Sequence, residues 1–416
     1  VLAKREGFPL SLAELPKHNV SDADNAATYI RRLSEIEERK PLSKEDRLLI
    51  HDELQSSRPL TSKQISRAKA LFAHRQDILS NIEKAVASRY FVVPMPMVKG
   101  TNLPDLDPPN PLFSGMRSAQ RWINAETATL LADGKYKEAV ESQTKVLHLA
   151  RIIRQAPSLS VLMSGIILEQ ISVSRAKKIL LVAGGKPEIA QKVAEALQRE
   201  GGSPSFDTAL RSELAMRMTV VDAMGKKAAR QLNTTAFVPT DIQKEMKRYG
   251  YPDDPKQALE RYVNANETNL ILKYIELKSI MASPYYQKLS HGFPPQKEID
   301  RLSQEPDMGF AYSALSPYAF FRSSLVSNEA DREIFLMGAR VLAWKVKRGA
   351  FPNSLKEVVS SIPLDPFDGK PLHYRKEGAG FVVYSVGENR KYDGRVLEKG
   401  RGRESIFRYP APPQKP

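Results

Sequence analysis

Cysteine is absent from all 416 residues of the chain. Its absence excludes disulfide frameworks, thiolate zinc sites, iron–sulfur clusters and a cysteine nucleophile, without indicating a compartment. Apolar runs are short as well. The longest lie around residues 166–168 and 179–183, far below the roughly 20 residues that cross a bilayer. The sequence therefore predicts a water-soluble protein that is held together by packing without disulfides.

The sequence also lacks the common motifs for metal binding, phosphate binding and a serine nucleophile. The six histidines include no pair with helical metal-ligand spacing and no His-Glu-x-x-His. The Gly-Gly-Lys at residues 184–186 precedes a proline instead of serine or threonine, which indicates a helix end and a new helix start instead of a phosphate loop. Neither Ser164 nor Ser385 has the preceding glycine of a nucleophile elbow. No reaction class follows, and we expect a non-enzymatic protein.

Positive charge is in excess, with 63 basic against 48 acidic residues and a formal net charge of +15. Such a balance suits a polyanion, because each neutralised phosphate releases counterions. The basic residues are spread along the chain, however, and are interleaved with acids in its last third. This pattern is typical of solvated surface, so we expect no nucleic acid partner, and polyanion binding stands as the second alternative function.

The first three quarters of the chain read as helix. An N-terminal helical segment spans residues 1–93, with Asp22 or Asp24 as a candidate cap of its first long helix and Thr61 or Ser62 as the start of another. Six prolines at residues 94–111 predict a connector over 94–114. The helical core of the body follows over residues 115–325, built from antiparallel helices joined by short turns.

Within this core, the segment from Leu159 to Ile171 is apolar on nearly every side and should be the most buried helix. Glu169 lies inside it, where an unpaired carboxyl would have a raised pKa. If it lines a cleft, it is a candidate catalytic acid, and the protein is an enzyme or small-ligand binder, which is the first alternative function. The competing interpretation pairs it with Arg175, Lys145 or a backbone group.

The pattern changes near residue 326. One last helix, starting from about Asn328, ends at Gly349, and Pro352 prevents its continuation. Alternating segments near residues 372–375, 380–386 and 405–409 then predict three strands, separated by glycine-containing turns. We expect a mainly α-helical fold with a small C-terminal α+β module, a helix plus an antiparallel meander, over residues 326–409, and an extended tail over 410–416.

This ending resembles the globular domain of type II secretion major pseudopilins over about residues 328–409. The matching segments are Gly-Ala-Phe-Pro at 349–352, Pro-Leu-Asp-Pro-Phe-Asp-Gly-Lys-Pro-Leu-His-Tyr at 363–374 and Phe-Val-Val-Tyr-Ser-Val-Gly at 381–387. Pseudopilins polymerise through an apolar N-terminal stem, whereas the helix here is amphipathic and follows about 325 residues of other structure. The resemblance implies the module's fold, and the missing stem argues against fibre formation by that route.

In that family the loop after the last matching segment commonly binds calcium. The corresponding loop offers Asp393 and Glu404 as the best candidate ligands. It also carries six cations at positions 390, 391, 395, 399, 401 and 403, which should repel a divalent ion. We therefore expect no cofactor and keep calcium as the alternative.

The whole chain is similar to uncharacterised bacterial proteins that have a membrane anchor, a helical body and this C-terminal module. The residues that prompt this are Gly-Phe-Pro-Leu-Ser-Leu-Ala-Glu-Leu at 7–15 and Asp-Asn-Ala-Ala at 24–27, together with the ending. The resemblance implies an extracytoplasmic, periplasmic or cell-surface protein, tethered to the inner membrane by a segment preceding Val1. The leading expectation is an interaction or scaffold protein of an envelope or secretion assembly.

Overall fold

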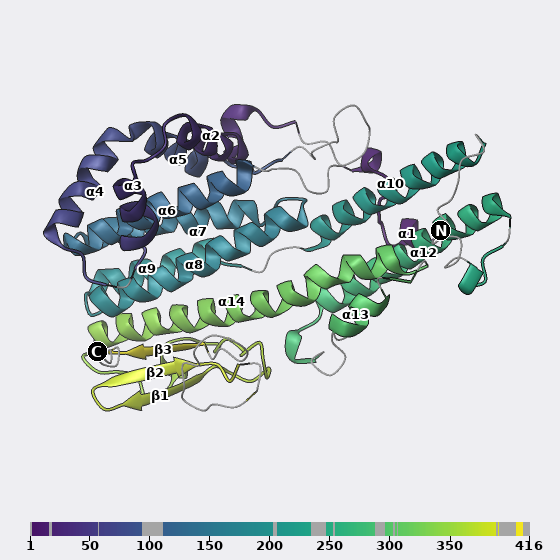
Figure 1. Cartoon of the computed structure of the whole chain (residues 1–416). Helices are drawn as coiled ribbons and strands as arrows, with labels where there is room; N and C mark the ends of the chain where they lie inside the picture. Colours follow the sequence, from purple (N-terminus) through teal and green to yellow (C-terminus); the bar gives the residue numbers. More distant parts are fainter. Residues whose placement is uncertain are drawn as a thin grey trace.

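The computed structural model describes residues 2–15, 19–56, 58–93, 111–202, 206–233, 247–252, 254–287, 296–302, 304–305, 307–387, 390 and 405–410. Over these residues the protein is mainly α-helical, with a three-stranded antiparallel sheet near the C-terminus, so the predicted fold class is confirmed at that level. Figure 1 shows helices stacked lengthwise above one long helix, with the sheet beneath it.

The short helix α1 (Leu2–Arg5) lies apart from the other N-terminal helices, at the right of Figure 1. The layer of short helices follows, with α2 (Ala26–Arg39), α3 (Lys44–Leu48), α4 (Ser62–His74) and α5 (Gln76–Ala87). The predicted start of α4 is confirmed, because Thr61 and Gln64 form a reciprocal capping box. The predicted cap of α2 was wrong. The cap is Asn25, whose side chain accepts a hydrogen bond from the Ala27 N–H while its amide donates to the Val92 carbonyl.

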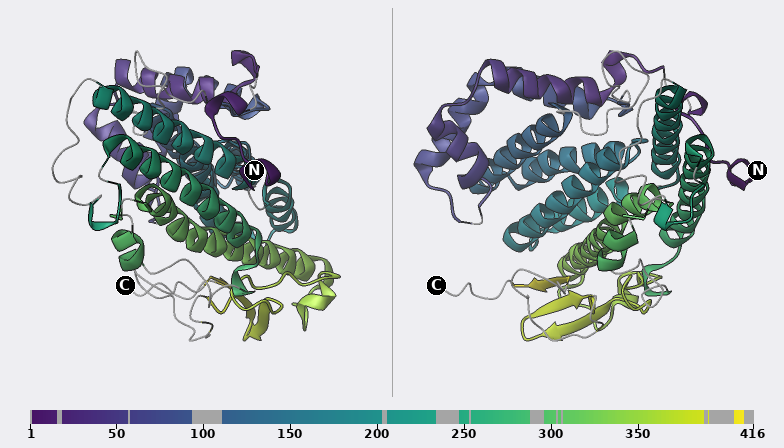
Figure 2. Two further views of the ribbon diagram at one scale, coloured as in Figure 1. Left: turned by 90° about the vertical axis from the view of Figure 1, so that its right-hand side faces the viewer. Right: turned by 45° about the vertical axis from the view of Figure 1, so that its right-hand side comes forward.

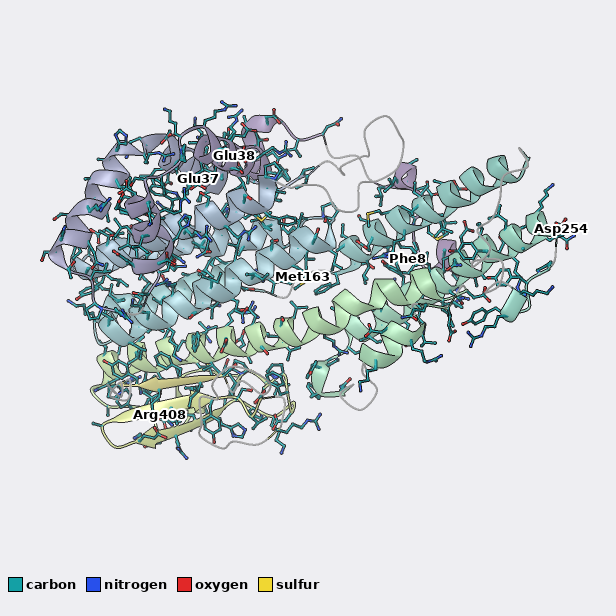
Figure 3. The ribbon with its side chains drawn as sticks, viewed as in Figure 1. Phe8, Glu37, Glu38, Met163, Asp254 and Arg408 are labelled. Atoms are coloured by element: carbon teal, nitrogen blue, oxygen red, sulfur yellow. The ribbon has the colours of Figure 1, made fainter. Side chains whose placement is uncertain are left out.

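The central layer follows as α6 (Pro111–Ala132), α7 (Tyr136–Ile153), α8 (Leu159–Ala183) and α9 (Pro187–Glu200). Residues 111–114, expected to belong to the connector, are helical, because proline suits the first turn of a helix. The rest of that connector, 94–110, lies outside the described residues. Glu37 of α2, labelled in Figure 3, ties the N-terminal layer to α6 by accepting hydrogen bonds from Ser118 and Trp122.

Helix α8 is central, as predicted, because its side chains enter three separate hydrophobic clusters. Val161 and Leu168 pack with α2, α5 and α6, residues 173–183 pack with α9 and the sheet, and Met163 packs with Phe8 near the N-terminus. Figure 3 labels Phe8 and Met163. By length and composition α8 is the one described helix that would suit a membrane span, although 61% of its most apolar window is buried inside the protein.

The remaining long helices pack along one end of the body. The long helices are α10 (Phe206–Asn233), α12 (Pro255–Ala282) and α14 (Gly309–Arg348), and the short α13 (Gln296–Leu302) lies beside them. Helices α12 and α13 contact α14, and α10 contacts α12. Both views of Figure 2 place α2–α5 on the side of the central helices that faces away from the sheet. Helix α14 therefore lies between the helical body and the sheet.

The sheet consists of β1 (His373–Glu377), β2 (Gly380–Tyr384) and β3 (Ile406–Tyr409) in that spatial order, all antiparallel, which confirms the predicted meander. It lies directly on α14, where the fully buried ring of Phe407 packs on Gly338 and leaves no room for a Cβ atom. Lys177 of α8 reaches past α14 and donates to the Ile406 carbonyl at 2.9 Å. The strands are thus fastened to the body as well as to α14.

The expected boundary at residues 325 and 326 falls inside α14. This helix begins at Gly309, well before the predicted start near Asn328, and ends as predicted at Gly349, which adopts a left-handed φ of 79°. One hydrophobic cluster contains Leu180 of the body, Met337 of α14 and Phe381 of the sheet. Body and C-terminal module share both a helix and a core.

Candidate functional site

Glu169 lies in the middle of α8 and its side chain is buried, with 2% of its surface exposed. Its Oε2 atom accepts hydrogen bonds from Arg154 Nη1 at 2.7 Å and from Asn328 Nδ2 at 2.7 Å. Its Oε1 atom accepts one from Arg332 Nη1 at 3.4 Å. Both carboxylate oxygens are therefore engaged, by groups that come from α7 and α14.

The two arginines are themselves held by the end of α9. Arg154 donates to the Gly202 carbonyl at 2.6 Å and to the Glu200 carbonyl at 3.0 Å, and Arg332 also reaches Gly202. Carbonyl groups at a helix C-terminus lack partners within the helix and carry partial negative charge, so buried cations stabilise them. We call Arg154, Glu169, Asn328, Arg332 and these two carbonyls the core charge cluster.

The side chain of Glu200 extends this charged region toward the surface. It accepts hydrogen bonds from Arg151 at 2.9 Å and Arg199 at 2.7 Å, and it lies 3.2 Å from His148 Nδ1. Burial by itself would raise the pKa of Glu200, but the hydrogen bonds from Arg199 and Arg151 and the neighbouring His148 together lower it below the usual value. Glu200 therefore stays ionised and joins α7 to α9.

The partners predicted for Glu169 were wrong. Arg175 donates instead to the Gln55 carbonyl at 2.6 Å, and Lys145 pairs with Glu83 and Glu126. The general expectation that Glu169 sits in a helix–helix seam agrees with its place between α7, α8 and α14. A buried carboxylate bound by two guanidinium groups and an amide is a hydrogen-bond acceptor that joins helices.

Glu329 lies beside the core charge cluster, and its protonation makes the stability of the protein depend on pH. Burial, reinforced by the negative charges of Glu333 and Glu169 and opposed by Arg332, raises the pKa of Glu329 above the ordinary 4.5. A carboxyl whose pKa is higher in the folded state binds its proton more tightly there than in the unfolded chain. Its contribution to stability is therefore present below pH 4.5 and is lost as the pH rises through the folded-state pKa.

We therefore expect Glu329→Gln, which mimics the protonated form, to raise the melting temperature at pH 7. The gain over the unmodified protein should shrink as the pH falls toward 4.5, because Glu329 then becomes protonated itself. Glu333→Gln is the matched control, since Glu333 accepts from Arg332 at 3.4 Å and its loss should slightly destabilise the protein. Melting curves of both variants between pH 4 and 8 test this, and a lower melting temperature for Glu329→Gln at pH 7 would contradict it.

A second buried carboxylate organises the C-terminal module. Asp365 has no exposed surface, and its Oδ1 atom accepts from the Phe367 N–H at 3.0 Å and the Ser385 hydroxyl at 2.9 Å. Its Oδ2 atom accepts from the Val386 N–H at 2.8 Å. The predicted turn at Asp365 is present as an α-turn, with the Gly369 N–H bonded back to the Asp365 carbonyl four residues earlier. The carboxylate connects this turn to the chain that leaves β2.

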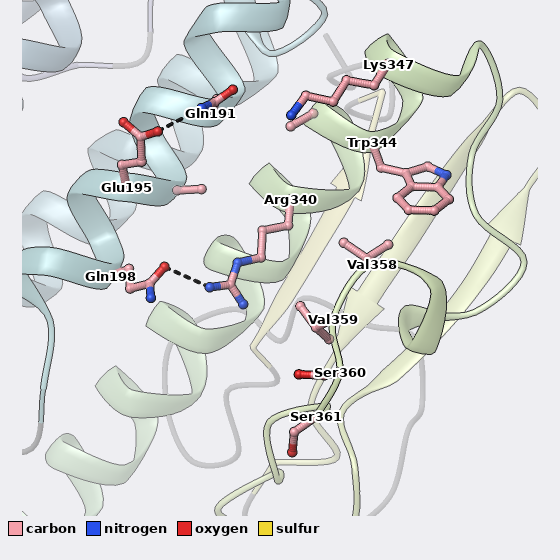
Figure 4. A pocket seen from close by; sticks show the side chains of 12 residues that line it. Gln191, Glu195, Gln198, Arg340, Trp344, Lys347, Val358, Val359, Ser360 and Ser361 are labelled. Carbon is pink, nitrogen blue, oxygen red and sulfur yellow. Dashed lines mark hydrogen bonds between the residues drawn. The ribbon is translucent and has the colours of Figure 1, made fainter.

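An open groove lies where α9, α14 and residues 358–361 meet (Figure 4). Its volume is about 550 Å³, within the range of ligand sites. The side chains that line it are Gln191, Ala194, Glu195 and Gln198 from α9, Arg340, Ala343, Trp344 and Lys347 from α14, and Val358, Val359, Ser360 and Ser361. The groove was not predicted, because the i, i+3, i+4, i+7 spacing on α9 or on α14 alone does not distinguish a groove wall from an ordinary solvent-facing stripe.

The structure does not describe the other candidate site residues. Asp393 and Glu404, the candidate calcium ligands, lie outside the described residues, as do most of the cations of their loop. Within the described ranges no group of three histidine, aspartate or glutamate side chains is arranged to hold a metal ion. The described sites are therefore the core charge cluster, the Asp365 turn and the groove.

No family model, no curated protein and no solved structure compared with the chain gives a significant match.

Proposed function

We propose that this protein is a non-enzymatic scaffold or interaction protein of the extracytoplasmic space, tethered to a membrane and part of an envelope or secretion assembly. The observation that carries the scaffold part is the core charge cluster. It joins α7, α8 and the end of α9 to α14 through one buried carboxylate. Since α14 also bears the sheet, the cluster and the shared core hold the body and the module in one fixed arrangement.

The rival function, catalysis by Glu169 in a cleft, has less support. Glu169 is buried and both its oxygens are occupied, whereas a general acid must reach the reacting group of a substrate. The groove between α9 and α14 is lined by side chains from residues 191–198 and 340–347 of these helices and does not include Glu169. A buried Glu169 and a groove without it favour a binding surface for a partner over an active site.

The compartment and the tether rest on the resemblance of residues 7–15, 24–27 and 328–409 to anchored extracytoplasmic proteins. A pseudopilin-like module would suit a place beside a secretion assembly. Here the module has no polymerising stem of its own and is mounted instead on a helical body. On this proposal the module contributes a rigid face of an assembly component.

Fractionation of the cells that produce the protein, followed by cross-linking in intact cells, tests the proposal. We expect the full-length protein in the membrane fraction, sensitive to protease added outside the inner membrane, and reproducibly cross-linked to an envelope protein through surface lysines. A cytosolic, protease-protected protein would contradict the compartment and the tether. Turnover of a small molecule that is lost in Glu169→Gln, with the fold intact, would contradict the non-enzymatic function.

A further inference from the structure

The groove has a regular construction that follows from helix geometry. On α14 the lining positions are 340, 343, 344 and 347, and on α9 they are 191, 194, 195 and 198. Both sets follow the i, i+3, i+4, i+7 spacing of one helix face. Each places alanine at i+3, Ala343 and Ala194, and long polar or aromatic side chains at the other positions. Two antiparallel polar stripes thus form facing walls, with residues 358–361 as the third side (Figure 4).

Charge is distributed unevenly over these walls. Gln191 donates to Glu195 at 2.9 Å, so the acidic side chain on the α9 wall already has a partner. On the α14 wall, Arg340 donates to the neutral Gln198 at 2.9 Å, and neither Arg340 nor Lys347 makes an ion pair with a described residue. The α14 wall therefore presents two cations whose charge no described acidic side chain balances.

The spacing of these cations sets the shape of a matching ligand. Positions 340 and 347 are seven residues apart, which is about 10.5 Å along a helix that rises about 1.5 Å per residue. A peptide in the extended polyproline II conformation advances about 3.1 Å per residue with three residues per turn, so two of its side chains three residues apart lie on the same side and about 9 Å apart. Trp344 lies between the two cations on α14, and Val358 and Val359 line the groove beside it. These apolar groups suit a side chain located between two acidic ones.

We propose that the groove binds an extended peptide segment of a partner protein that carries two carboxylates about three residues apart with an apolar residue between them. Arg340 and Lys347 pair with the carboxylates, and the amides of Gln191 and Gln198 and the hydroxyls of Ser360 and Ser361 are positioned for the peptide backbone. This inference rests on the proposed function in one respect, namely that the partner is a protein.

A nucleic acid or another polyphosphate fits the same groove less well. Two cations neutralise few phosphates, and Glu195 on the opposite wall would repel a ligand with charge along its whole length. A peptide carries its carboxylates at separate points and leaves neutral backbone to face the α9 wall. Charge complementarity therefore favours an acidic peptide.

The test is a selection of random twelve-residue peptides displayed on phage against the immobilised full chain. We expect enriched peptides to carry two acidic residues three positions apart around an apolar residue. Synthetic copies should bind at least about tenfold more weakly to Arg340→Glu/Lys347→Glu, a loss that corresponds to about 1.4 kcal/mol. The matched control is Lys63→Glu/Lys84→Glu, which makes the same charge change at exposed positions of α4 and α5 and should alter the affinity less than about twofold.

Reversing the charges of both the peptide and the groove shows whether a loss of affinity comes from charge or from misfolding of the variant. A copy of the best peptide with lysines in place of its acids should regain affinity for Arg340→Glu/Lys347→Glu and bind the unmodified chain poorly. No enrichment, enrichment of peptides without acids, or equal losses in the groove and control variants would each overturn the inference. Such results leave the fractionation and cross-linking outcome untouched, so failure here is distinguishable from failure of the proposed function.

Discussion

Glu169→Ala is expected to lower the free energy of unfolding by about 3–5 kcal/mol, the usual cost of removing one partner from a buried ion pair. The alanine would leave the buried Arg154 without its carboxylate partner and would leave Arg332, beside it, with only Glu333 at 3.4 Å; the two side chains are 4% and 8% exposed. It would also free the Asn328 amide. Like charges in a low-dielectric interior repel, so the seam between α8 and α14 should open first.

Urea unfolding followed by circular dichroism measures this loss, and hydrogen exchange locates it. Exchange should speed up in the part of α14 around Arg332 and in the end of α9, because both are held through the core charge cluster. Glu138→Ala on α7 removes an exposed carboxyl and should stay within about 0.5 kcal/mol of the unmodified protein. Glu169→Gln keeps one acceptor oxygen and should fall between the two. Equal stabilities for Glu169→Ala and Glu138→Ala would show that the cluster contributes nothing to the fold.

The sequence pointed to Glu169 but not to its partners, and helix geometry explains both results. A charged residue in an apolar segment is visible in the sequence alone, because burial without a partner is costly. Arg175, the predicted partner, lies six residues later and so about 120° around the helix from Glu169, which places it on another face. The true partners come from α7 and from α14, 15 and 163 residues away in the chain. Only the packing of whole helices brings them together.

The C-terminal module shows the same division between local and long-range information. Gly349, Pro352 and the alternating segments act locally, so the end of α14 and the three strands were predicted close to their observed positions. The start of α14 was predicted too late, near Asn328, and the missed part of the helix contains Pro317, a residue type that usually ends a helix. The helix nevertheless continues through it, and α14 as a whole packs against α12 and α13. Tertiary packing here outweighs the roughly 3 kcal/mol that a proline costs inside a helix.

The groove could not be predicted from the sequence for a related reason. Polar stripes at i, i+3, i+4 and i+7 occur on the solvent face of most amphipathic helices, so neither stripe is informative by itself. The groove exists because α9 and α14 turn these stripes toward each other and residues 358–361 close one side. Its charge balance likewise depends on which cations find partners, as Lys192 does with Glu141, and which do not.

Asp365→Ala is expected to lower the stability of the C-terminal module by about 4 kcal/mol. The substitution removes three hydrogen bonds to a charged acceptor, each worth roughly 1.5–3 kcal/mol, with part of the loss recovered by local rearrangement. It would leave the N–H groups of Phe367 and Val386 without partners in a closed interior. Asp365→Asn should be nearly as harmful, because an amide nitrogen placed at Oδ2 would face the Val386 donor instead of accepting from it.

Asp368→Ala is the matched control for this prediction. Asp368 lies in the same turn, but its carboxylate accepts one hydrogen bond, from the Lys370 N–H at 2.9 Å at an exposed position. The loss of this bond should cost about 0.5–1.5 kcal/mol.

Limited proteolysis and hydrogen exchange of β2 and β3 report on the module directly. In Asp365→Ala both strands should exchange faster than in Asp368→Ala, and cleavage should begin near Val386. The core charge cluster should protect α7 and α8 equally in the two variants, since it involves no residue of the turn. Indistinguishable exchange in β2 would mean that Asp365 forms the turn without fastening it to the sheet.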